Sequence, residues 1–453
     1  MTEKPRLRRR SRPSRSLRLI LTAAGCGFCL LFGRPGTAAG QEADSGVNVH
    51  WGGHLRAIAT VSDIGDDTIY QFARSGAFFD GQAELRLKNE LFFGSRWSLE
   101  THYEAVAAGG DTRRSSLSLR RQFAGYDVDW LIPSSEITDD QRFFDFSHTL
   151  VDNDSVVVYH RLDRLNLTYA PSWGSLRIGR QALTWGNGMV FNPMDLFDPF
   201  APTAIQRDYK LGEDMILAQA YFGRHDGQAV ILPRRDPSDG DIDGTRSTYA
   251  GKLHVLNDDW ESDLMVARNY DDDVLGAGIV GTLGGAAWRL NTVYTAVSKD
   301  YDRDNFLQVV ANMDYAWTWG GKNIYGLLEY YYNGLGRSGD YGQALHSAYT
   351  LARLSRGDLF GLGRNYLAAR LQIELHPLLR NDWTLIVNLD DPSLLLQPQW
   401  SWDVATDLQL IVGITWHEGR HGTEYGGFDV SAAGHTVTVS PADQAFLWLT
   451  YSF

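Results

Sequence analysis

Apolar and polar side chains alternate with a period of two along most of this chain. Leu85, Leu87 and Leu91 share one face of a segment whose other face carries Glu84, Arg86, Lys88 and Glu90. This pattern is typical of strands that have one apolar and one polar face. We predict about 18 strands, near residues 46–61, 80–93, 96–108, 155–170, 175–186, 215–223, 227–235, 247–257, 260–270, 273–283, 286–299, 305–319, 322–333, 364–376, 382–389, 394–406, 408–417 and 444–453.

The predicted connections alternate between short and long. Tight turns such as Gly94-Ser95 and Gly320-Gly321 join every other pair of strands. Most of the remaining connections are long, namely 62–79, 109–154, 187–214, 334–363 and 418–443. A soluble β-sandwich would also show alternating faces, but it would not explain why short turns and long loops alternate along the chain. The pattern predicts an all-β fold, a transmembrane antiparallel barrel with short periplasmic turns and long extracellular loops.

Aromatic residues gather at the ends of the predicted strands, where an interfacial girdle would lie between hydrocarbon and water. Trp97, Trp260 and Trp319 are examples. The apolar faces then contact lipid and the polar faces line a wet lumen. After residue 40 no apolar run is long enough for a transmembrane helix.

The first 40 residues have a different composition. Arginines and one lysine precede the apolar run Leu19 to Phe32, which is followed by small residues up to Gly40. This order predicts a cleaved signal peptide over 1–40, leaving 41–453 as a single barrel. Cys26 lies in a weak lipoprotein-like context, so lipid attachment is the alternative. A transmembrane anchor is disfavoured because the apolar run is short.

Charge and cysteine content exclude several classes of function. The chain holds 42 Lys and Arg against 55 Asp and Glu, and residues 1–40 contain nine and one of these. The remaining 33 basic and 54 acidic residues give a net charge of about −21, which disfavours a nucleic-acid partner. Both cysteines, Cys26 and Cys29, lie in the predicted signal. With no motif for a hydrolase, nucleotide or metal site, we expect neither enzymatic activity nor a cofactor.

The chain ends with alternating apolar residues and a terminal aromatic, Leu447, Leu449, Tyr451 and Phe453. This ending resembles the assembly signal of bacterial outer-membrane barrels. The resemblance implies a Gram-negative outer-membrane location, contact with lipid and lipopolysaccharide, and recognition by the barrel-assembly machinery through the last strand.

A second resemblance lies between residues 176 and 215. Gly179-Arg180-Gln181, Trp185-Gly186 and Asn192-Pro193-Met194-Asp195 follow one another in the order found in large porin-like barrels, including the alginate-export group. It implies a porin-like channel. Alginate exporters are expected to have a basic lumen, whereas the inward positions here mix both signs, which puts a polyanionic substrate in doubt.

The segment 187–214 is too rich in proline and apolar residues for a freely solvated loop. Phe191, Met194, Leu196, Phe197 and Phe200 need cover, which folding back into the lumen would supply. We expect either a constriction loop or an external loop packed on its neighbours. Arg180 falls on the lipid-facing phase, which is costly. A bulge, a position at the rim or a reversed phase must resolve that conflict.

Interleaved inward charges predict salt-bridge ladders across the lumen wall, and one assembled ring of charge would be needed for strong ion selectivity. The candidate pore and constriction residues are Glu84, Arg86, Lys88, Glu104, Arg164, Arg177, Gln181, Trp185, Asn192, Asp195, Asp198 and Arg207. The leading hypothesis is a channel that passes small hydrophilic solutes or exports a polymer such as a polysaccharide. The alternatives are a plugged surface-binding or scaffold barrel and an outer-membrane hydrolase.

Overall fold

The structure is a computed structural model that describes residues 47–126, 128–132, 138–202, 209–301 and 303–453. Within these residues, 19 strands form one antiparallel sheet, and all except β4 form a ring that closes between β1 and β21. The predicted fold class, a closed antiparallel barrel of 18 strands, is confirmed. The predicted signal peptide over 1–40 lies outside the described residues.

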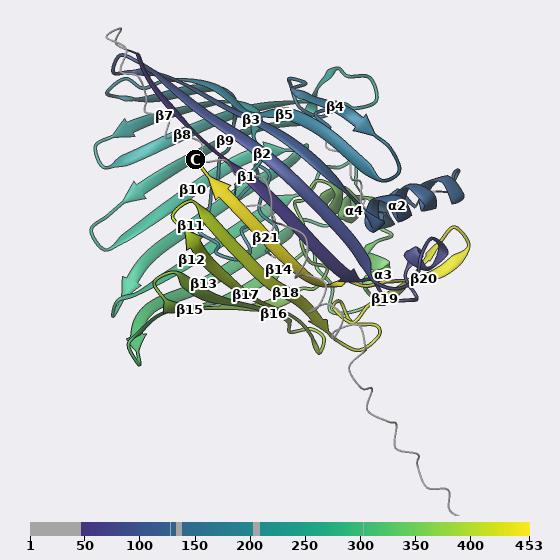
Figure 1. Cartoon of the computed structure of the whole chain (residues 1–453). Coiled ribbons are helices and arrows are strands. Elements are labelled where there is room, and N and C mark those ends of the chain that lie inside the picture. The colour runs from purple at the N-terminus through teal and green to yellow at the C-terminus, as the bar shows by residue number, and fades with distance from the viewer. Residues whose placement is uncertain (1–46, 127, 133–137, 203–208, 302) are drawn as a thin grey trace, which may run out of the picture. The chain divides into compact units, whose positions relative to one another are not determined.

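The barrel strands lie close to the predicted segments (Figure 1). They are β1 (Val47–Asp63), β2 (Phe78–Phe93), β3 (Trp97–Gly110), β5 (Val156–Tyr169), β6 (Gly174–Gln181), β7 (Glu213–Phe222), β8 (His225–Arg235), β9 (Ile242–Leu256), β10 (Trp260–Asn269), β11 (Asp272–Leu283), β12 (Ala286–Ala296), β13 (Phe306–Trp319), β14 (Lys322–Asn333), β15 (Asn365–His376), β16 (Leu379–Asn388), β17 (Ser393–Ala405), β18 (Leu408–Glu418) and β21 (Asp443–Ser452).

The outer face of the barrel is apolar. Ile178, Leu264, Val266 and Leu328 are each about half exposed, as expected for side chains that face lipid. Trp319, at the end of β13, is 77% exposed, and an aromatic ring at a strand end suits the interface between hydrocarbon and water. Among the described residues, no helix combines the length and apolar character needed to cross a bilayer.

The long connections are more structured than the sequence predicts. The 109–154 connection contains α2 (Asp111–Gln122), η2 (Asp129–Leu131) and strand β4 (Ser147–Asp152). The connection before β15 contains α3 (Tyr341–Ala344) and α4 (Ala348–Ser355), and η1 (Ile69–Phe72) precedes β2. A separate hairpin, β19 (Phe428–Ala432) and β20 (His435–Val439), precedes β21. In Figure 1 these elements gather at one end of the barrel, opposite the short turns.

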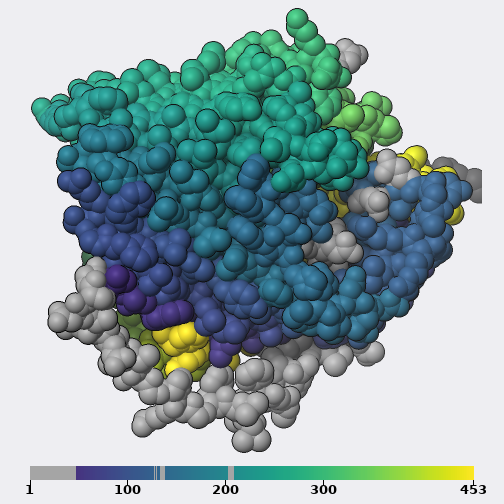
Figure 2. Space-filling model, turned by 90° about the horizontal axis from the view of Figure 1, so that it is seen from above, coloured from purple at the N-terminus to yellow at the C-terminus, as the bar shows by residue number. Residues whose placement is uncertain are grey.

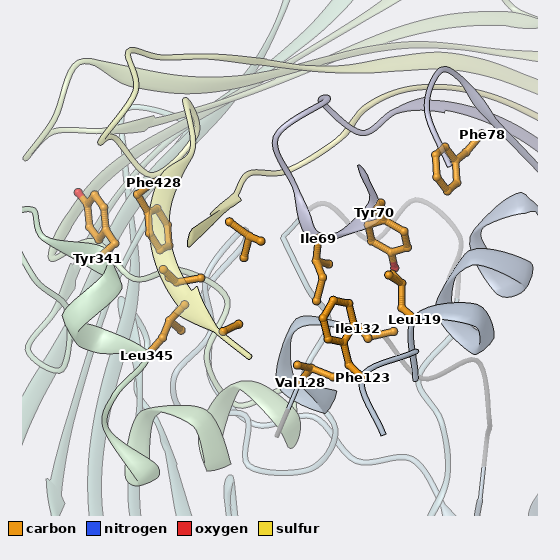
Figure 3. Packing of buried hydrophobic residues seen from close by; sticks show 13 residues of the cluster. Ile69, Tyr70, Phe78, Leu119, Phe123, Val128, Ile132, Tyr341, Leu345 and Phe428 are labelled. Carbon is orange, nitrogen blue, oxygen red and sulfur yellow. The ribbon is translucent and has the colours of Figure 1, made fainter. Parts of the chain in front are cut away.

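Four of these connections share one apolar cluster, shown in Figure 3. Ile69, Leu119, Tyr341 and Phe428 belong to it and come from η1, α2, α3 and β19. Each is at most 5% exposed. In Figure 2 the blue surface of α2 and the yellow surface of the late hairpin meet at the same end of the molecule. Loops that are distant in sequence therefore form a common structure there, because each hides an apolar face on the others.

The conflict at Arg180 is resolved by its position at the rim. Arg180 pairs across the ladder with Leu165 and Asp214, on the outward phase that Ile178 also occupies. Its side chain is nevertheless buried, because residues 139–146 cover it. Asp214 lies 2.8 Å from Arg180 Nε, Asp139 lies 2.7 Å from Nη1, and the Phe146 ring centre is 4.8 Å from the guanidinium carbon.

Residues 139–146, which we call the covering segment, continue the barrel wall beyond the end of the short strand β6. The N–H of Arg235 in β8 donates to the carbonyl of Gln141 at 3.0 Å, and β4 pairs with β5 where β6 no longer reaches. Burial alone would raise the pKa of Asp139, but its hydrogen bond and charge interaction with Arg180 hold that pKa below its usual value. The rim ion cluster is thus shielded from lipid by Phe144 and Phe146, whose rings stack at 5.3 Å.

Candidate functional site

The connection from β6 to β7 folds into the barrel, and we call its described residues, 182–202 and 209–212, the inserted loop. Strand β6 was predicted to reach residue 186 but ends at Gln181. Gly186 makes the turn that follows, with φ +86°, where a Cβ would lie 2.2 Å from Asn192 Oδ1. Asn192 Nδ2 in turn donates to the Trp185 carbonyl at 2.9 Å. The WG and NP residues of the sequence pattern therefore fold the loop back on itself.

Apolar residues of the inserted loop pack against the inner wall between β7 and β12. Trp185, Met194 and Phe197 are at most 1% exposed and belong to one cluster with residues of these strands. Phe191 and Leu196 are also buried, as expected, whereas Phe200 is 40% exposed, so the prediction that it needs cover is wrong. The outcome supports the expectation that folding inward covers most of these side chains.

Two glycines of β11 make room for the loop. A Cβ on Gly276 would lie 3.2 Å from the Met194 methyl carbon, and a Cβ on Gly278 would lie 3.4 Å from Asn187 Nδ2 and 2.6 Å from Asn291. Both therefore face the space that the loop fills. A pair of glycines two residues apart in a strand is a sequence signal for such a close approach.

Glu329 of β14 holds the first part of the loop. Its carboxylate accepts the backbone N–H groups of Met189, Val190 and Phe191 at 2.7, 3.1 and 2.7 Å. The Asn312 amide donates a fourth hydrogen bond at 3.0 Å, and the side chain is fully buried. A buried carboxylate is acceptable in such a place because its lone pairs are filled by donors. The alternation of β14 turns Glu329 inward, but no sequence pattern indicates that it anchors the loop.

A buried ion pair joins the two halves of the inserted loop. Lys210 Nζ lies 2.7 Å from both carboxylate oxygens of Asp195 and also donates to the Leu183 carbonyl at 2.6 Å. Both residues are about 5% exposed. Burial raises the pKa of Asp195 to about 6, while the Lys210 charge acts in the opposite direction. The pair holds the loop closed because either charge alone would be buried without a counter-charge.

Tyr209 fastens the far end of the loop to the opposite side of the barrel. Its hydroxyl shares its one proton between Glu84, at 2.7 Å, and Glu104, and its ring centre lies 3.5 Å from the Arg86 guanidinium carbon. Burial, followed by the nearby Glu104 charge, raises the pKa of Tyr209, so its hydroxyl keeps the proton. Glu84 and Glu104 lie on β2 and β3, whereas Glu329 lies on β14, so the loop is fixed on two sides of the lumen.

The wall beneath Tyr209 is a ladder of alternating charges, as predicted. Arg86 pairs with Asp163, Arg161 pairs with Glu104, and Arg164 Nη1 lies 2.7 Å from Asp163 Oδ2. A bulge in β5 directs the consecutive residues Asp163 and Arg164 into the same cluster. Simple alternation places only one of two neighbours inside, which is why the sequence did not indicate Asp163.

The sequence-predicted site residues fall into four groups, of which the last, Gln181 and Trp185, is packed away from solvent. Those brought together at the anchored loop and its wall are Glu84, Arg86, Glu104, Arg164, Asn192, Asp195 and Asp198, the last accepting the N–H of Leu211 at 3.2 Å. Lys88 is exposed, and Arg177, partly buried, donates to Thr168 at 3.1 Å, both away from the loop anchors. Arg207 lies outside the described residues.

Gln181 and Trp185, both predicted to be constriction residues, are packed away from solvent. Gln181 is completely buried and donates to the Met215 carbonyl at 3.1 Å. The Trp185 indole donates to Gln228 of β8 at 2.7 Å. Their interpretation as pore-lining groups is wrong in this structure, because Gln181 ties β6 to β7 and Trp185 fastens the loop to β8. No motif distinguishes Tyr209 and Lys210 from ordinary loop residues, so their roles could not be predicted from the sequence.

Glu90, Glu100 and His102 are the one group among the described residues with spacing suitable for a metal ion. Arg86 Nη2 lies 3.1 Å from His102 Nδ1, and Glu100 Oε1 lies 3.3 Å from His102 Nε2. An arginine can only donate, so Nδ1 accepts and the proton resides on Nε2, facing Glu100. Both ring nitrogens are thus engaged within the wall, and we assign these residues no metal.

No protein-family model matches the chain, and no curated protein matches its sequence. Solved structures do match. OccAB1 of Acinetobacter baumannii superposes with a TM-score of 0.51 at 10% identity, over 92% of this chain and 99% of OccAB1. OccAB2 of the same organism gives 0.50 at 11% identity, over 90% and 98%. A BenF-like porin of Pseudomonas fluorescens Pf-5 gives 0.49 at 9% identity, over 89% and 98%.

The chain has the fold of an outer-membrane porin. At these identities the likeness establishes the architecture alone.

Proposed function

We propose that this protein is an outer-membrane channel for small hydrophilic solutes, with the inserted loop as its constriction. The observation that carries the proposal is the anchoring of one loop to two sides of a polar lumen, through Glu329 on β14 and through Glu84 and Glu104 on the other side. A loop fixed at both ends narrows a barrel of this size, which would otherwise leave an aqueous channel. The bacterial outer membrane is the location that such a barrel requires.

Within this proposal the wall and the loop have different roles. Glu84, Arg86, Glu104 and Arg164 hold the constriction on one side, while Lys88 and Arg177 face the lumen away from the loop anchors. Asn192, Asp195 and Asp198 shape the loop itself. Lipid and lipopolysaccharide contact the outer face, and assembly through the last strand and Phe453 remains a prediction from the ending of the sequence.

Export of a polymer is a further prediction that the alginate-like sequence pattern suggests. The lumen wall pairs its charges, for example Arg289 with Asp314 at 2.8 Å. A polyanion such as alginate would need a surplus of positive charge along its path. The paired wall therefore favours small solutes over this substrate.

A plugged surface-binding barrel is the second candidate. It is favoured by the apolar cluster that joins η1, α2, α3 and β19 at one end of the barrel. A cluster of this size gives the loops a fixed shape, which suits a binding surface as well as a channel entrance.

Conductance across a planar lipid bilayer tests the proposal. Purified full-length protein is expected to give stepwise conductance, together with swelling of liposomes in small sugars or amino acids. Protein that is folded, as judged by heat-modifiable electrophoretic mobility, but gives no conductance steps would favour the plugged barrel.

A further inference from the structure

The connection between β18 and β19 brings a second loop to the inner wall of the barrel, and we call its residues 419–427 the late loop. The late loop is folded tightly on itself. A Cβ on Gly426 would lie 2.3 Å from the Arg420 carbonyl oxygen, and the Thr423 hydroxyl donates to the same carbonyl at 2.6 Å. Because the turn is this compact, the next residue after Thr423, Glu424, is held in one place against the wall.

Glu424 fixes the late loop to the wall through its carboxylate. The carboxylate accepts the Leu362 N–H and the Asn388 amide, both at 2.6 Å. The Tyr366 hydroxyl shares its proton between the two carboxylate oxygens, at 2.8 and 2.7 Å. Tyr366 and Asn388 are completely buried residues of β15 and β16, and the Glu424 N–H donates to Asp391 at 2.8 Å. Three neutral donors thus hold the charged group in a fixed direction.

Two glycines make room for the Tyr366 hydroxyl beside Glu424. A Cβ on Gly361 would lie 2.4 Å from the hydroxyl oxygen, and a Cβ on Gly363 would lie 2.8 Å from it. The Gly363 N–H also donates to this oxygen at 2.6 Å. A larger residue at either position would displace the hydroxyl, so the contact between Tyr366 and Glu424 depends on the local backbone.

The ring of Tyr366 reaches the inserted loop. The Phe191 ring centre lies 4.5 Å from that of Tyr331 and 5.3 Å from that of Tyr366, and the two tyrosine rings are 6.0 Å apart. Phe191 also carries one of the N–H groups that Glu329 accepts. Tyr425 of the late loop packs against the same apolar cluster. Tyr366 therefore contacts the late loop through its hydroxyl and the inserted loop through its ring.

The late loop also leads into the apolar cluster of Figure 3. Phe428 and Val430, which follow the late loop in β19, belong to that cluster. Tyr341 of the same cluster donates to Asp391 at 2.8 Å, and this carboxylate oxygen is also the one that accepts the Glu424 N–H. The extracellular cluster and the inserted loop therefore meet at Glu424.

We propose that Glu424 is a positioning residue for the constriction, which couples the extracellular cluster to the inserted loop through Tyr366. Packed interiors transmit strain, so a displacement of the late loop shifts the Tyr366 ring and with it Phe191. The two loops then change position together. The effect on the constriction rests on the proposed channel function, whereas the coupling between the loops does not.

Hydrogen exchange of the full-length protein in detergent tests the coupling. Glu424→Gln replaces one acceptor oxygen with an amide, so one of the donors around it loses its partner. We expect the amides of residues 189–191 to exchange about tenfold faster in this variant, because local opening becomes easier. Glu418→Gln is the matched control, since Glu418 is exposed at the end of β18. Faster exchange confined to the late loop, or an equal change in the control, would overturn the coupling.

Tyr366→Phe distinguishes coupling from a general loss of packing, because it keeps the ring and removes only the hydroxyl. It should accelerate exchange at residues 189–191 as much as Glu424→Gln does, and the double variant should add no further increase. Additive effects would show that the two residues act independently and would contradict the proposal. If Glu424→Gln loses its heat-modifiable folded band, the milder Tyr366→Phe still decides the question by the exchange of residues 189–191.

Conductance distinguishes this inference from the channel itself. In a planar bilayer, Glu424→Gln should raise the noise of the open level severalfold, whereas Glu418→Gln should leave it unchanged. Unchanged noise in a conducting Glu424→Gln protein would refute the effect on the constriction. Coupled exchange in a protein that gives no conductance would instead refute the channel and leave the coupling of the two loops standing.

Discussion

Glu329 is the residue on which the position of the inserted loop depends most directly. Replacing it by glutamine removes the charge from an acceptor that serves three backbone N–H groups, each such charged bond being worth about 1.5 to 3 kcal/mol. We expect Glu329→Gln to release the loop and give larger, noisier conductance steps. Glu374→Gln is the control, because that lumen carboxylate bonds Asn323 and not the loop. Equal conductance and noise in both variants would contradict the anchoring role.

Because Asp195 is buried, the free energy of unfolding should depend on pH. Its folded pKa of about 6 lies above the ordinary value of 3.8. The neutral Asp195 carboxyl therefore stabilises the folded state. This contribution is fully present below pH 3.8 and is lost as the pH rises through 6. The free energy of unfolding should therefore increase on acidification between pH 6 and 4, by about 1 kcal/mol per pH unit from this group.

Urea unfolding in detergent measures this contribution, with Asp195→Asn as the variant that should lack it. Asparagine resembles the neutral form of Asp195, so the free energy of unfolding of the variant should be nearly independent of pH between 6 and 4. An Asp195→Asn protein with the pH profile of the original protein would exclude Asp195 as the titrating group.

Residue-scale roles were partly predictable. Arg180 stood out because an arginine on the lipid phase violates the alternation, and the cover by residues 139–146 is the physical answer. Glu84, Arg86 and Glu104 followed from strand phase. Tyr209 did not, because a single tyrosine after a loop carries no periodic signal, and Asp163 did not, because a bulge shifts the phase of its strand.

At the scale of elements, the pairing of β1 with β21 closes the barrel, and the glycines of β1 allow this closure to be tested. Gly53 exchanges two backbone hydrogen bonds with Phe453, at 2.9 and 3.0 Å. A Cβ on Gly53 would lie 2.2 Å from the Arg86 carbonyl oxygen, whereas a Cβ on the neighbouring Gly52 would lie 3.4 Å from its nearest contact. Gly53→Ala should therefore impair closure, and Gly52→Ala should be tolerated.

Heat-modifiable mobility on gels measures the closed fraction of each variant. We expect a clear loss of the fast-migrating folded band for Gly53→Ala and little change for Gly52→Ala. The reverse order would mean that the strands shift to relieve the contact at Gly53.

The strands themselves were predictable because lipid on one side and water on the other impose alternation on every barrel strand. β4 was missed since nearly all its side chains are exposed, so its two faces do not differ. The helices and the β19–β20 hairpin were missed because they acquire their apolar partners only from distant loops. Strand β6 was predicted too long because Leu183 and Trp185 continue the alternation while packing inside the lumen instead of facing lipid.

At the scale of the whole molecule, paired charges predict a weakly selective pore. Arg86, Arg289 and Lys252 each have an acidic partner across the wall. We expect the permeability ratio of potassium to chloride to stay within about threefold, since strong selectivity needs an unbalanced ring of charge. The reversal potential in a tenfold salt gradient measures it.

Glu90 is exposed, so its charge can be reversed to perturb the charge balance of the lumen wall. Glu90→Lys should move the reversal potential toward anion preference without altering the loop anchors. Strong selectivity in the unaltered protein would show that charge balance across the described wall does not govern permeation.

The patch of wall built from residues 139–146 has a consequence for the order of folding. Arg235 bonds the carbonyl of Phe143 from 92 positions away, so this part of the wall cannot form until β8 is in place. Closing so long a loop has an entropic penalty that local hairpins avoid. We therefore expect the patch to assemble after the neighbouring hairpins and to open before them. In hydrogen exchange the Arg235 amide should lose protection earlier than the amides in the middle of β8.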